Sequence, residues 1–494
     1  MADAPRAPLA RLRQILAALL RRGAPVPAPR LPAAAAGTSA LERALAALSI
    51  DHPGCSGFVL LDDGPIAFLL RAALADRAEQ RIDVQYYAYL ADAAGTLLML
   101  RLLAAADRGV RVRILLDDSG IGWRDRALAE LHAHPCIEVR LFNPSSVRRG
   151  LLRVVEFLFN MRRLNRRMHN KTFAVDRAAA IVGGRNVSDR YFAARAHTSF
   201  RDYDVAALGA AAAEAADSFE RFWRSPLAVP ASQLVALPRA ANALARRRVR
   251  LEARVARLVP DHAERRAAAA AQLSHWLGGT ALHWARGGVV AENPERASGA
   301  DERVVAGRLA DVLATAEREV LIESAYFVPG AGGLALFAEL VRRGVRVRIL
   351  TNALAATDVP VVHAGYAPYR APLLEAGVEL HEFRTGLHAK VLVVDRRIAW
   401  VGSFNVDPRS VDLNTEAGML IESPSLAEEL AGHIERDLDP EHAWRLAHDA
   451  GGSLVWRGTR RGRALEFRRE PETPFWRRAH VALFSLVPGY EGLL

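Results

Sequence analysis

The chain contains the same pattern twice, and this internal repeat is the feature that most restricts its fold. RIDVQYYAYLADAAGTLLMLRLLAAADRGVRVRILLDDSG begins at Arg81, and REVLIESAYFVPGAGGLALFAELVRRGVRVRILTNAL begins at Arg318. Each segment contains a β-rich stretch, an amphipathic helical stretch and the shared RGVRVRIL, where glycine ends a helix before a buried strand. Repetition of a strand–helix–strand unit predicts an α/β fold made of two homologous α/β sandwich lobes related by an approximate two-fold axis.

A second repeated pattern contains every lysine of the chain. Of the 66 Lys and Arg residues only two are lysines, and they lie in MHNKTFAVDRAAAIVGGRN and LHAKVLVVDRRIAWVGSFN. In both segments a histidine precedes the lysine by two residues and an aspartate follows it by five. The repeated residues are His169, Lys171, Asp176, Gly184 and Asn186 in the first half, and His388, Lys390, Asp395, Ser403 and Asn405 in the second.

Each of these segments has the pattern of a β-hairpin. The first strand is predicted to run from the histidine to Val175 or Val394, and the Asp-Arg pair then turns the chain. Residues two apart on a strand point to the same face, so the histidine and the lysine can contact one ligand. Asp176 and Asp395 lie at the turn and off that face, which predicts a mainly structural role for both.

A pair of histidines, one from each half, can carry out nucleophilic and acid–base catalysis on a phosphodiester. Neutral imidazole is a nucleophile toward phosphorus, and imidazolium can protonate an alkoxide leaving group. Each lysine would place a compact ammonium group on a phosphate oxygen, where the planar fork of arginine fits less well. Asn186, Asn405 and the backbone around Gly184 and Ser403 would stabilise the charge that develops on phosphorus. No metal ion or other cofactor is expected.

Each imidazole also requires a carboxylate that holds its orientation. Acidic residues follow the two motifs at similar places, Asp204 in FRDYDVAALG and Glu416 in DLNTEAGMLIE. We therefore expect Asp204 and Glu416 to orient the histidines. Asp202 and Asn414 occupy the corresponding positions two residues earlier.

With its duplicated HxKxxxxD motif, the chain resembles the phospholipase D superfamily. LNRRMHNK, GGRN, TNALAATDVPVVHAGYAPYR, GSFNVDPRS and FWRRAHVALFSLVPG are similar to the bacterial cardiolipin synthase C branch, from about Ser56 to the C-terminus. The resemblance implies one active site at the interface of two lobes and metal-independent catalysis through a phosphohistidine. By analogy with the superfamily, His169 is the nucleophile and His388 the general acid/base; the two motifs alone are symmetric in this respect.

The same resemblance implies a phosphatidyltransferase that makes cardiolipin by transferring a phosphatidyl group onto phosphatidylglycerol. The donor, a glycerophospholipid, would be phosphatidylglycerol or phosphatidylethanolamine. The alternatives are a hydrolytic phospholipase D that releases phosphatidic acid and a phosphodiesterase that cleaves nucleic acid. No run of aromatic residues interleaved with cations is evident, so a nucleic acid partner is not expected. The sequence leaves open whether a partner protein is required.

The net charge of +11 favours partners that present phosphate, among them an anionic membrane surface. The stretch RRGLLRVVEFLFNMRRLNRRMHNK is predicted to form a helix, with Arg153, Glu156, Asn160 and Arg163 as a narrow polar stripe. Such a helix can lie at lipid headgroups, and a buried domain helix is an equal alternative. The tail PFWRRAHVALFSLVPGY is too short to span a bilayer but suits an interfacial anchor.

Other features bear on the compartment. No apolar run approaches the roughly 20 residues of a transmembrane helix, and the N-terminal ILAALL is too short for a signal peptide. The only cysteines, Cys55 and Cys136, lack CxxC spacing, which is typical of a reducing compartment. We therefore expect a protein of the bacterial cytoplasm that binds the inner face of the cell membrane.

These patterns divide the chain into five parts. The first contains a cationic amphipathic helix, with Leu9, Leu12, Leu16 and Leu19 on one stripe, followed by a linker. The predicted parts are residues 1–50 (helix and linker), 51–230 (first lobe), 231–300 (helical connector), 301–450 (second lobe) and 451–494 (membrane-interface tail).

Overall fold

A computed structural model gives the structure of residues 37–123, 125–148, 151–192, 199–235, 242–258 and 282–484, together with residues 267 and 271. The predicted N-terminal cationic helix and the last ten residues of the tail lie outside these ranges. Within them, no helix is both long enough and apolar enough to cross a bilayer.

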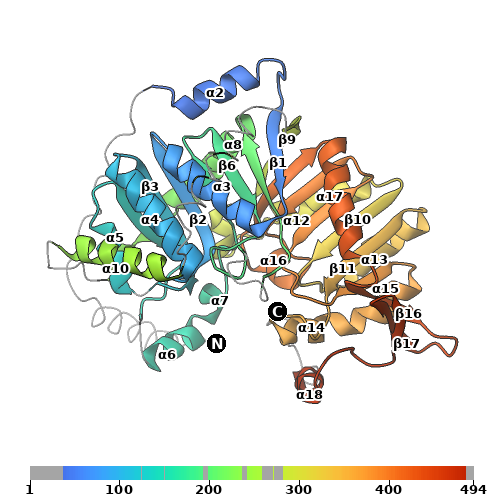
Figure 1. Cartoon of the computed structure of the whole chain (residues 1–494). Helices are drawn as coiled ribbons and strands as arrows, with labels where there is room; N and C mark the ends of the chain where they lie inside the picture. The colour runs from blue at the N-terminus through green and yellow to red at the C-terminus, as the bar shows by residue number, and fades with distance from the viewer. Residues whose placement is uncertain are drawn as a thin grey trace, which may run out of the picture.

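The first lobe is a mixed sheet with helices on both faces (Figure 1). Its strands, in sheet order, are β8 (Ala228–Pro230), β4 (Ile137–Phe142), β3 (Arg111–Ile121), β2 (Arg81–Tyr89), β5 (Thr172–Val175), β6 (Ala179–Gly183), β7 (Asp204–Leu208) and β1 (Ser56–Leu61). Strands β2, β3 and β4 are parallel, and the other neighbouring pairs are antiparallel. The surrounding helices are α2 (Ala40–Leu48), α3 (Gly64–Arg77), α4 (Ala93–Asp107), α5 (Asp125–His132), α6 (Leu151–Phe159), α7 (Met161–Leu164) and α8 (Ala210–Arg224).

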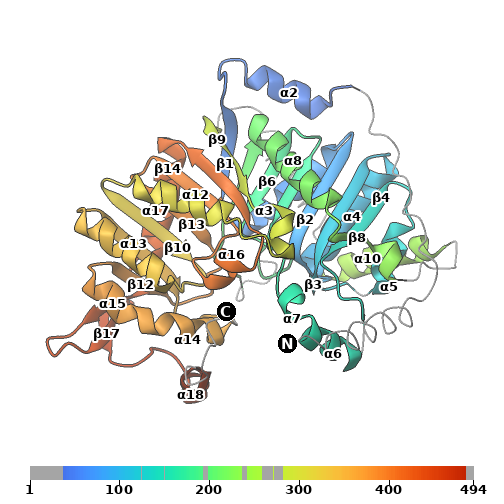
Figure 2. The same ribbon diagram turned by 180° about the vertical axis from the view of Figure 1, so that it is seen from behind.

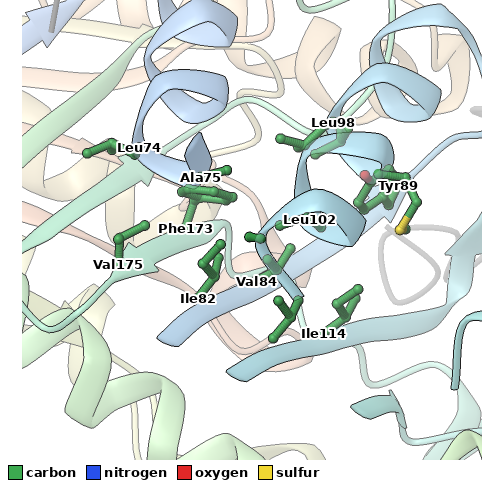
Figure 3. Close-up of a cluster of buried hydrophobic side chains, with 14 of the residues drawn as sticks. Leu74, Ala75, Ile82, Val84, Tyr89, Leu98, Leu102, Ile114, Phe173 and Val175 are labelled. Carbon is green, nitrogen blue, oxygen red and sulfur yellow. The ribbon is translucent and has the colours of Figure 1, made fainter. Parts of the chain in front are cut away.

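Helices α3 and α4 cover one face of this sheet and build its core. Each begins at an aspartate that caps it: Asp63 accepts a hydrogen bond from the Ile66 N–H, and Asp92 from the Gly95 N–H. Figure 3 shows Leu98 and Leu102 of α4 above the strand residues Val84 and Ile114. Because such side chains are fully buried, this face is a continuous apolar core.

The second lobe repeats the arrangement. Its strands, in sheet order, are β15 (Ala417–Glu422), β14 (Ile398–Gly402), β13 (Lys390–Val394), β10 (Glu319–Ser324), β11 (Arg346–Asn352), β12 (Glu379–Phe383), β16 (Ala443–His448), β17 (Leu454–Arg460) and β18 (Arg463–Phe467). Its helices are α12 (Val304–Ala314), α13 (Gly330–Arg342), α14 (Pro360–Tyr366), α15 (Arg370–Glu375), α16 (Pro408–Asp412), α17 (Pro424–Asp437) and α18 (Phe475–Phe484). Strands β10, β11 and β12 are parallel, as are their counterparts β2, β3 and β4. The predicted fold of two homologous α/β lobes is confirmed.

Strand β9 (His283–Ala291) connects the two sheets. It pairs antiparallel with β1 on one side and with β15 on the other. Residues 231–300, expected as a helical connector, contain helices α9 (Ala231–Leu234) and α10 (Ala243–Leu258) and also this strand, which was not expected from the sequence. The segment between the lobes is therefore part of the sheet structure.

A hydrophobic core shared by both lobes lies between the two sheets, around α8 and α17 (Figure 2). It includes Phe58 and Val205 from the first lobe and Val401 and Met419 from the second, all fully buried. Helix α17 of the second lobe also packs against β1 of the first. The two lobes therefore form one packed unit, and residues at their interface have defined positions.

Candidate active site

Two isolated β-bridges, each made of two backbone hydrogen bonds, cross the lobe boundary. Each bridge lies beside one of the repeated histidines. The His169 N–H donates to the Thr415 carbonyl at 2.9 Å, and the Thr415 N–H donates to the Arg167 carbonyl at 2.8 Å. In the same way, the His388 N–H donates to the Arg201 carbonyl at 2.7 Å, and the Arg201 N–H donates to the Gly386 carbonyl at 2.8 Å. The predicted strands begin later than expected, at Thr172 and Lys390, so these bridges and not the hairpins hold the histidines.

His169 is oriented by a carboxylate of the opposite lobe. Its Nδ1 lies 2.9 Å and 3.0 Å from the two carboxylate oxygens of Glu416. Glu416 is held in turn by the hydroxyl groups of Ser403 and Ser410, the latter at 2.8 Å. The Tyr87 ring and the imidazole form a T-shaped pair, with 5.1 Å between ring centroids. A carboxylate on Nδ1 leaves Nε2 as the nitrogen available for chemistry.

His388 has the equivalent arrangement. Its Nδ1 lies 2.7 Å from the Oδ2 atom of Asp202, a residue of the first lobe. The rings of Tyr191 and Phe200 enclose the imidazole, with centroids 4.9 Å and 5.6 Å away. The Tyr191 hydroxyl lies 3.5 Å from Nε2 of His388. Each lobe therefore contributes one imidazole and the carboxylate for the imidazole of the other lobe.

The two lysines lie beside the histidines. The Lys171 ammonium donates to the backbone carbonyl of His169, and that of Lys390 donates to the backbone carbonyl of His388. Both side chains are almost completely buried, and burial lowers the pKa of each amine below its ordinary value. An anionic ligand would stabilise the charged form of both amines and so oppose this lowering of their pKa, which means that the site favours a bound anion.

The electrostatics of the site keep both imidazoles neutral near pH 7. Burial lowers the pKa of His169 to about 4, although the charge of Glu416 opposes the shift. Burial also lowers the pKa of His388 well below its ordinary value, and the charges of Lys390 and Lys171 act in the same direction. Because Lys171 of the first lobe acts on His388 of the second, the pair of motifs forms one electrostatic site.

The expectation that Asp204 orients a histidine is wrong. Asp204 forms a buried ion pair with Arg71, with 2.8 Å between Arg71 Nη2 and Asp204 Oδ2. The backbone register explains the difference, because Gly184 donates to the Tyr203 carbonyl as Ser403 donates to the Ala417 carbonyl. Asp202 is therefore the counterpart of Glu416. Asn414 is not a counterpart of Asp202; its side chain lies 3.5 Å from Glu416.

Gly184 allows the carboxylate of Asp202 to approach, whereas its counterpart in the second lobe, Ser403, donates a hydrogen bond to Glu416. A β-carbon on Gly184 would lie 2.1 Å from Oδ1 of Asp202, so only glycine fits there. Asn186 is held by its own lobe: its Oδ1 accepts from the Ala88 N–H at 3.1 Å, and its Nδ2 donates to the Tyr191 hydroxyl at 3.1 Å. Asn405 is buried, and its Oδ1 has no hydrogen-bond partner within the described ranges.

Asp176 and Asp395 lie at the hairpin turns. The carboxylate of Asp176 accepts three backbone N–H bonds, from residues 79, 80 and 81, and that of Asp395 accepts three from residues 317, 318 and 319. Both residues have positive φ angles, 51° and 53°, as does the arginine that follows each. These aspartates attach each hairpin to the chain segment that enters the first central strand.

Several residues of the site were not predicted from the sequence. They are Asp202, Arg201, Tyr87, Tyr191, Phe200 and Ser410. For Asp202 the sequence contained a signal, namely Gly184. Glycine leaves room for a neighbouring side chain, and the strand register shows that this side chain is Asp202. The aromatic neighbours lie on separate loops and strands, and no sequence pattern links them to the histidines.

Comparison with known proteins agrees with this geometry. A family model described as "Cardiolipin synthase, PLD-like domain" matches residues 72–223 and 309–438, one segment in each lobe. The chain is 40% identical over 472 residues to cardiolipin synthase C of Escherichia coli K12, which covers 91% of this chain and 98% of that protein. It is 28% identical over 445 residues to cardiolipin synthase B of Shigella flexneri, covering 87% and 92%.

Among solved structures, phosphatidylserine synthase of Haemophilus influenzae Rd KW20 has the same fold. It superimposes with a TM-score of 0.58 at 14% identity, covering 91% of this chain and 97% of that one. The duplicated motif, the two lobes and the family match agree, and the chain belongs to the phospholipase D superfamily. Within that superfamily it belongs to the cardiolipin synthase branch and is an enzyme of the phosphatidyltransferase type.

Proposed function

We propose that this enzyme makes cardiolipin by transferring a phosphatidyl group onto phosphatidylglycerol through a phosphohistidine intermediate. The observation that carries the proposal is the exchange of carboxylates, since Glu416 orients His169 and Asp202 orients His388 across one interface. Two imidazoles prepared in this way supply one nucleophile and one acid. The 40% identity to cardiolipin synthase C of E. coli supports lipid as the substrate class.

The reaction proceeds in two displacements. In the first, Nε2 of His169 forms a bond to phosphorus while the bond from phosphorus to the departing alcohol breaks, and His388 gives that alcohol a proton. The departing alcohol is glycerol when phosphatidylglycerol is the donor, or ethanolamine when phosphatidylethanolamine is the donor. In the second, His388 removes a proton from a hydroxyl of phosphatidylglycerol, the oxygen bonds to phosphorus, and the bond from phosphorus to His169 breaks.

The remaining residues of the site bind and stabilise the phosphate. Lys171 and Lys390 supply compact ammonium groups, whose charged form the bound phosphodiester stabilises. The same anion raises the pKa of His388, which allows this imidazole to carry the proton needed by the leaving alcohol. Asn405, whose buried amide oxygen has no hydrogen-bond partner within the described ranges, would accept a hydrogen bond from the incoming hydroxyl. Asp176 and Asp395 hold the hairpins and take no part in bond making.

The lipid products of the purified enzyme test this proposal. Phosphatidylglycerol vesicles, with and without phosphatidylethanolamine, would be incubated with wild type and with His169→Ala, and the lipids then resolved. We expect cardiolipin from wild type and no turnover by the variant. Phosphatidic acid as sole product would mean that the enzyme is a hydrolase. In a parallel reaction with plasmid DNA, cleavage of the DNA together with unchanged lipid would mean that it is a nuclease.

An interfacial position on the inner membrane surface is part of the proposal. Helix α6 carries exposed apolar side chains, among them Leu158 (66%) and Phe159 (58%), and α18 carries Phe475 (78%) and Trp476 (63%). The two helices lie along the same edge of the molecule in both views, one in each lobe (Figures 1 and 2). Glu156 of the polar stripe faces the protein instead, where it accepts hydrogen bonds from residues 145–147. The exposed apolar side chains favour the interfacial helix over the buried alternative.

A further inference from the structure

A cavity of about 470 Å³ lies in the second lobe between helices α12, α13 and α16 and strands β10, β13 and β14. We call it the lobe 2 cavity. Its lining is mainly aliphatic and aromatic, with Leu309, Phe337 and Trp400 among the larger side chains. Lys390 is also part of the lining, so the cavity adjoins the phosphate-binding part of the active site.

The internal repeat allows this region to be compared with its counterpart in the first lobe. The hydrogen bonds of Asp176 and Asp395 make Glu79 equivalent to Glu317, which aligns α3 with α12 and β2 with β10. The positive-φ glycines at residues 109 and 344 end helices α4 and α13 at equivalent points. The segments that follow Asn186 and Asn405 are aligned by the bridges Tyr89–Val187 and Phe327–Val406.

At six equivalent positions, the first lobe has a larger side chain than the second. In the first lobe all six are buried within the molecule, and in the second all six counterparts line the cavity. The pairs are Phe68 and Ala306, Arg71 and Leu309, Tyr86 and Ser324, Leu97 and Gly332, Leu98 and Gly333, and Phe192 and Val411.

The first lobe therefore fills the space that the second leaves open. Arg71 donates to the Tyr86 hydroxyl at 2.9 Å and to Asp204 at 2.8 Å, and Phe68 packs on Phe192 with ring centroids 5.3 Å apart. Figure 3 shows Leu98 of α4 among the buried side chains of this core. In the second lobe the strand pairing places Gly418 where Asp204 lies in the first. The polar network and its surrounding rings are thus replaced by an open space whose lining is mainly apolar and also includes Glu323 and Asp407.

We propose that the lobe 2 cavity holds one acyl chain of the glycerophospholipid whose phosphate is bound between His169 and His388. This inference rests on the proposed function, which places a phospholipid at the site. If each chain carbon takes about as much space as one water molecule, roughly 30 Å³, then 470 Å³ accommodates about 15 carbons of a single chain.

The position of Lys390 indicates that the ligand of the cavity is an acyl chain of the bound lipid. A molecule that places a phosphate oxygen on the Lys390 ammonium and also fills an apolar cavity lined by Lys390 must carry an anionic phosphate and a long apolar group. A diacyl glycerophospholipid has both, separated by the short glycerol linker. The chain would also remove apolar surface from water at the moment when the phosphate is bound, which fixes the lipid relative to the histidines.

Filling the cavity with residues taken from the first lobe tests the proposal. Gly332→Leu introduces the equivalent residue at a helix position where a β-carbon meets nothing within 4 Å. Hydrolysis or transfer would be followed with monomeric hexanoyl, decanoyl and palmitoyl lysophosphatidylglycerol. For wild type we expect kcat/KM to rise with chain length, by up to about fourfold per added methylene. In Gly332→Leu this rise should be largely lost, while cleavage of the deacylated diester glycerophosphoglycerol stays unchanged.

The matched control is Gly307→Leu. Gly307 is also an exposed glycine of a helix bordering the cavity, a β-carbon there likewise meets nothing within 4 Å, and it is not part of the lining. It should keep the chain-length dependence of wild type. Ala306→Phe is a second filling variant, so that a folding defect of one variant, measured as its melting temperature, does not decide the result. Equal chain-length dependence in wild type and both filling variants would overturn the proposal.

A binding measurement separates this inference from the proposed function. Phosphatidylglycerol with a photoreactive diazirine at the end of one chain would be bound and irradiated, and the labelled peptides identified by mass spectrometry. We expect label in α12 or α13 of wild type and little in Gly332→Leu, whether or not the lipid is turned over. Label confined to α6 and α18 would overturn the cavity proposal, even if cardiolipin is formed.

Discussion

Asp202 and Asp204 are two residues apart in the chain, and they have different partners. Asp202 lies 2.7 Å from Nδ1 of His388, whereas Asp204 pairs with Arg71 in the interior of the first lobe. A slip of two residues along a strand leaves a side chain on the same face, so strand periodicity cannot distinguish the two aspartates. Only the backbone register of Gly184 identifies which one faces the site.

Substitution of the two aspartates should therefore have different effects, on catalysis for Asp202 and on stability for Asp204. Asp202→Asn should lower kcat on the order of 10³- to 10⁴-fold with little effect on melting, because His388 loses the acceptor that fixes its tautomer. Asp204→Asn should cost about 3–5 kcal/mol of stability, because it leaves a buried Arg71 without its counter-charge. Per folded molecule it should keep most of its kcat. Measured kcat and unfolding free energies of the two variants check this, and an inactive but stable Asp204→Asn would contradict the assignment.

The depressed pKa of His169 predicts an unusual acid limit for activity. Since burial lowers this pKa to about 4, the imidazole stays neutral and nucleophilic as the pH falls from 7 to near 4. An ordinary histidine would become protonated near pH 6.5 and lose its nucleophilicity there. The rate of attack by His169 should therefore persist at acid pH.

The measurement needs a leaving group that requires no acid, such as the nitrophenolate of bis(4-nitrophenyl) phosphate. With it, kcat/KM for phosphoenzyme formation, which reports the pKa of His169 in the free enzyme, should remain near its neutral value down to about pH 5. Circular dichroism at each pH would show whether the protein remains folded. A fall in rate centred near pH 6.5, with the fold intact, would mean that His169 is not buried as the structure has it.

At the scale of elements, the central strands and helices of each lobe could be predicted from the sequence, and their mutual placement could not. The repeat and the RGVRVRIL segment indicate strand, helix and strand, which correspond to β2, α4 and β3 and to β10, α13 and β11. The partner strands β9 and β1 lie more than 200 residues apart in the chain, and pairing over such a separation leaves no local pattern. The same limit applies to Glu416, because the repeat predicts that it orients a histidine but not that this histidine is His169 of the other lobe.

Helix α6 is the element for which the sequence left two interpretations, and its exposure leads to a prediction. Leu158→Asp or Trp476→Asp should weaken binding to phosphatidylglycerol vesicles roughly tenfold, since each removes an apolar side chain that would be buried among lipids. Vesicle sedimentation would measure the affinity. Cleavage of a soluble phosphodiester should not change, because neither residue contacts the site.

Val249→Asp is the control for these two variants. Val249 lies on α10 and is exposed to a similar extent, 64%, but belongs to neither of the proposed membrane helices. It should bind vesicles like wild type. Equal loss of binding in all three variants would attribute the effect to added negative charge and would remove the support for α6 and α18 as the contact surface.

The whole molecule is held together by structure that belongs to neither lobe alone. Strand β9 pairs with both sheets, and the core around α8 and α17 takes side chains from both. The site itself is divided in the same way, because each histidine requires a carboxylate of the other lobe. A lobe that unfolded on its own would expose the shared core and separate both histidines from their carboxylates.

We therefore expect the two lobes to unfold in one cooperative transition. Met419→Ala, in the shared core, and Leu102→Ala, in the core of the first lobe, should each cost about 2–5 kcal/mol because both side chains are fully buried. In a cooperative molecule each substitution lowers protection from hydrogen exchange in β2 and in β13 alike. Calorimetry would show a single peak. Two resolved peaks, with the effect of Leu102→Ala restricted to the first lobe, would mean that the lobes are independent and that the site forms only when they dock.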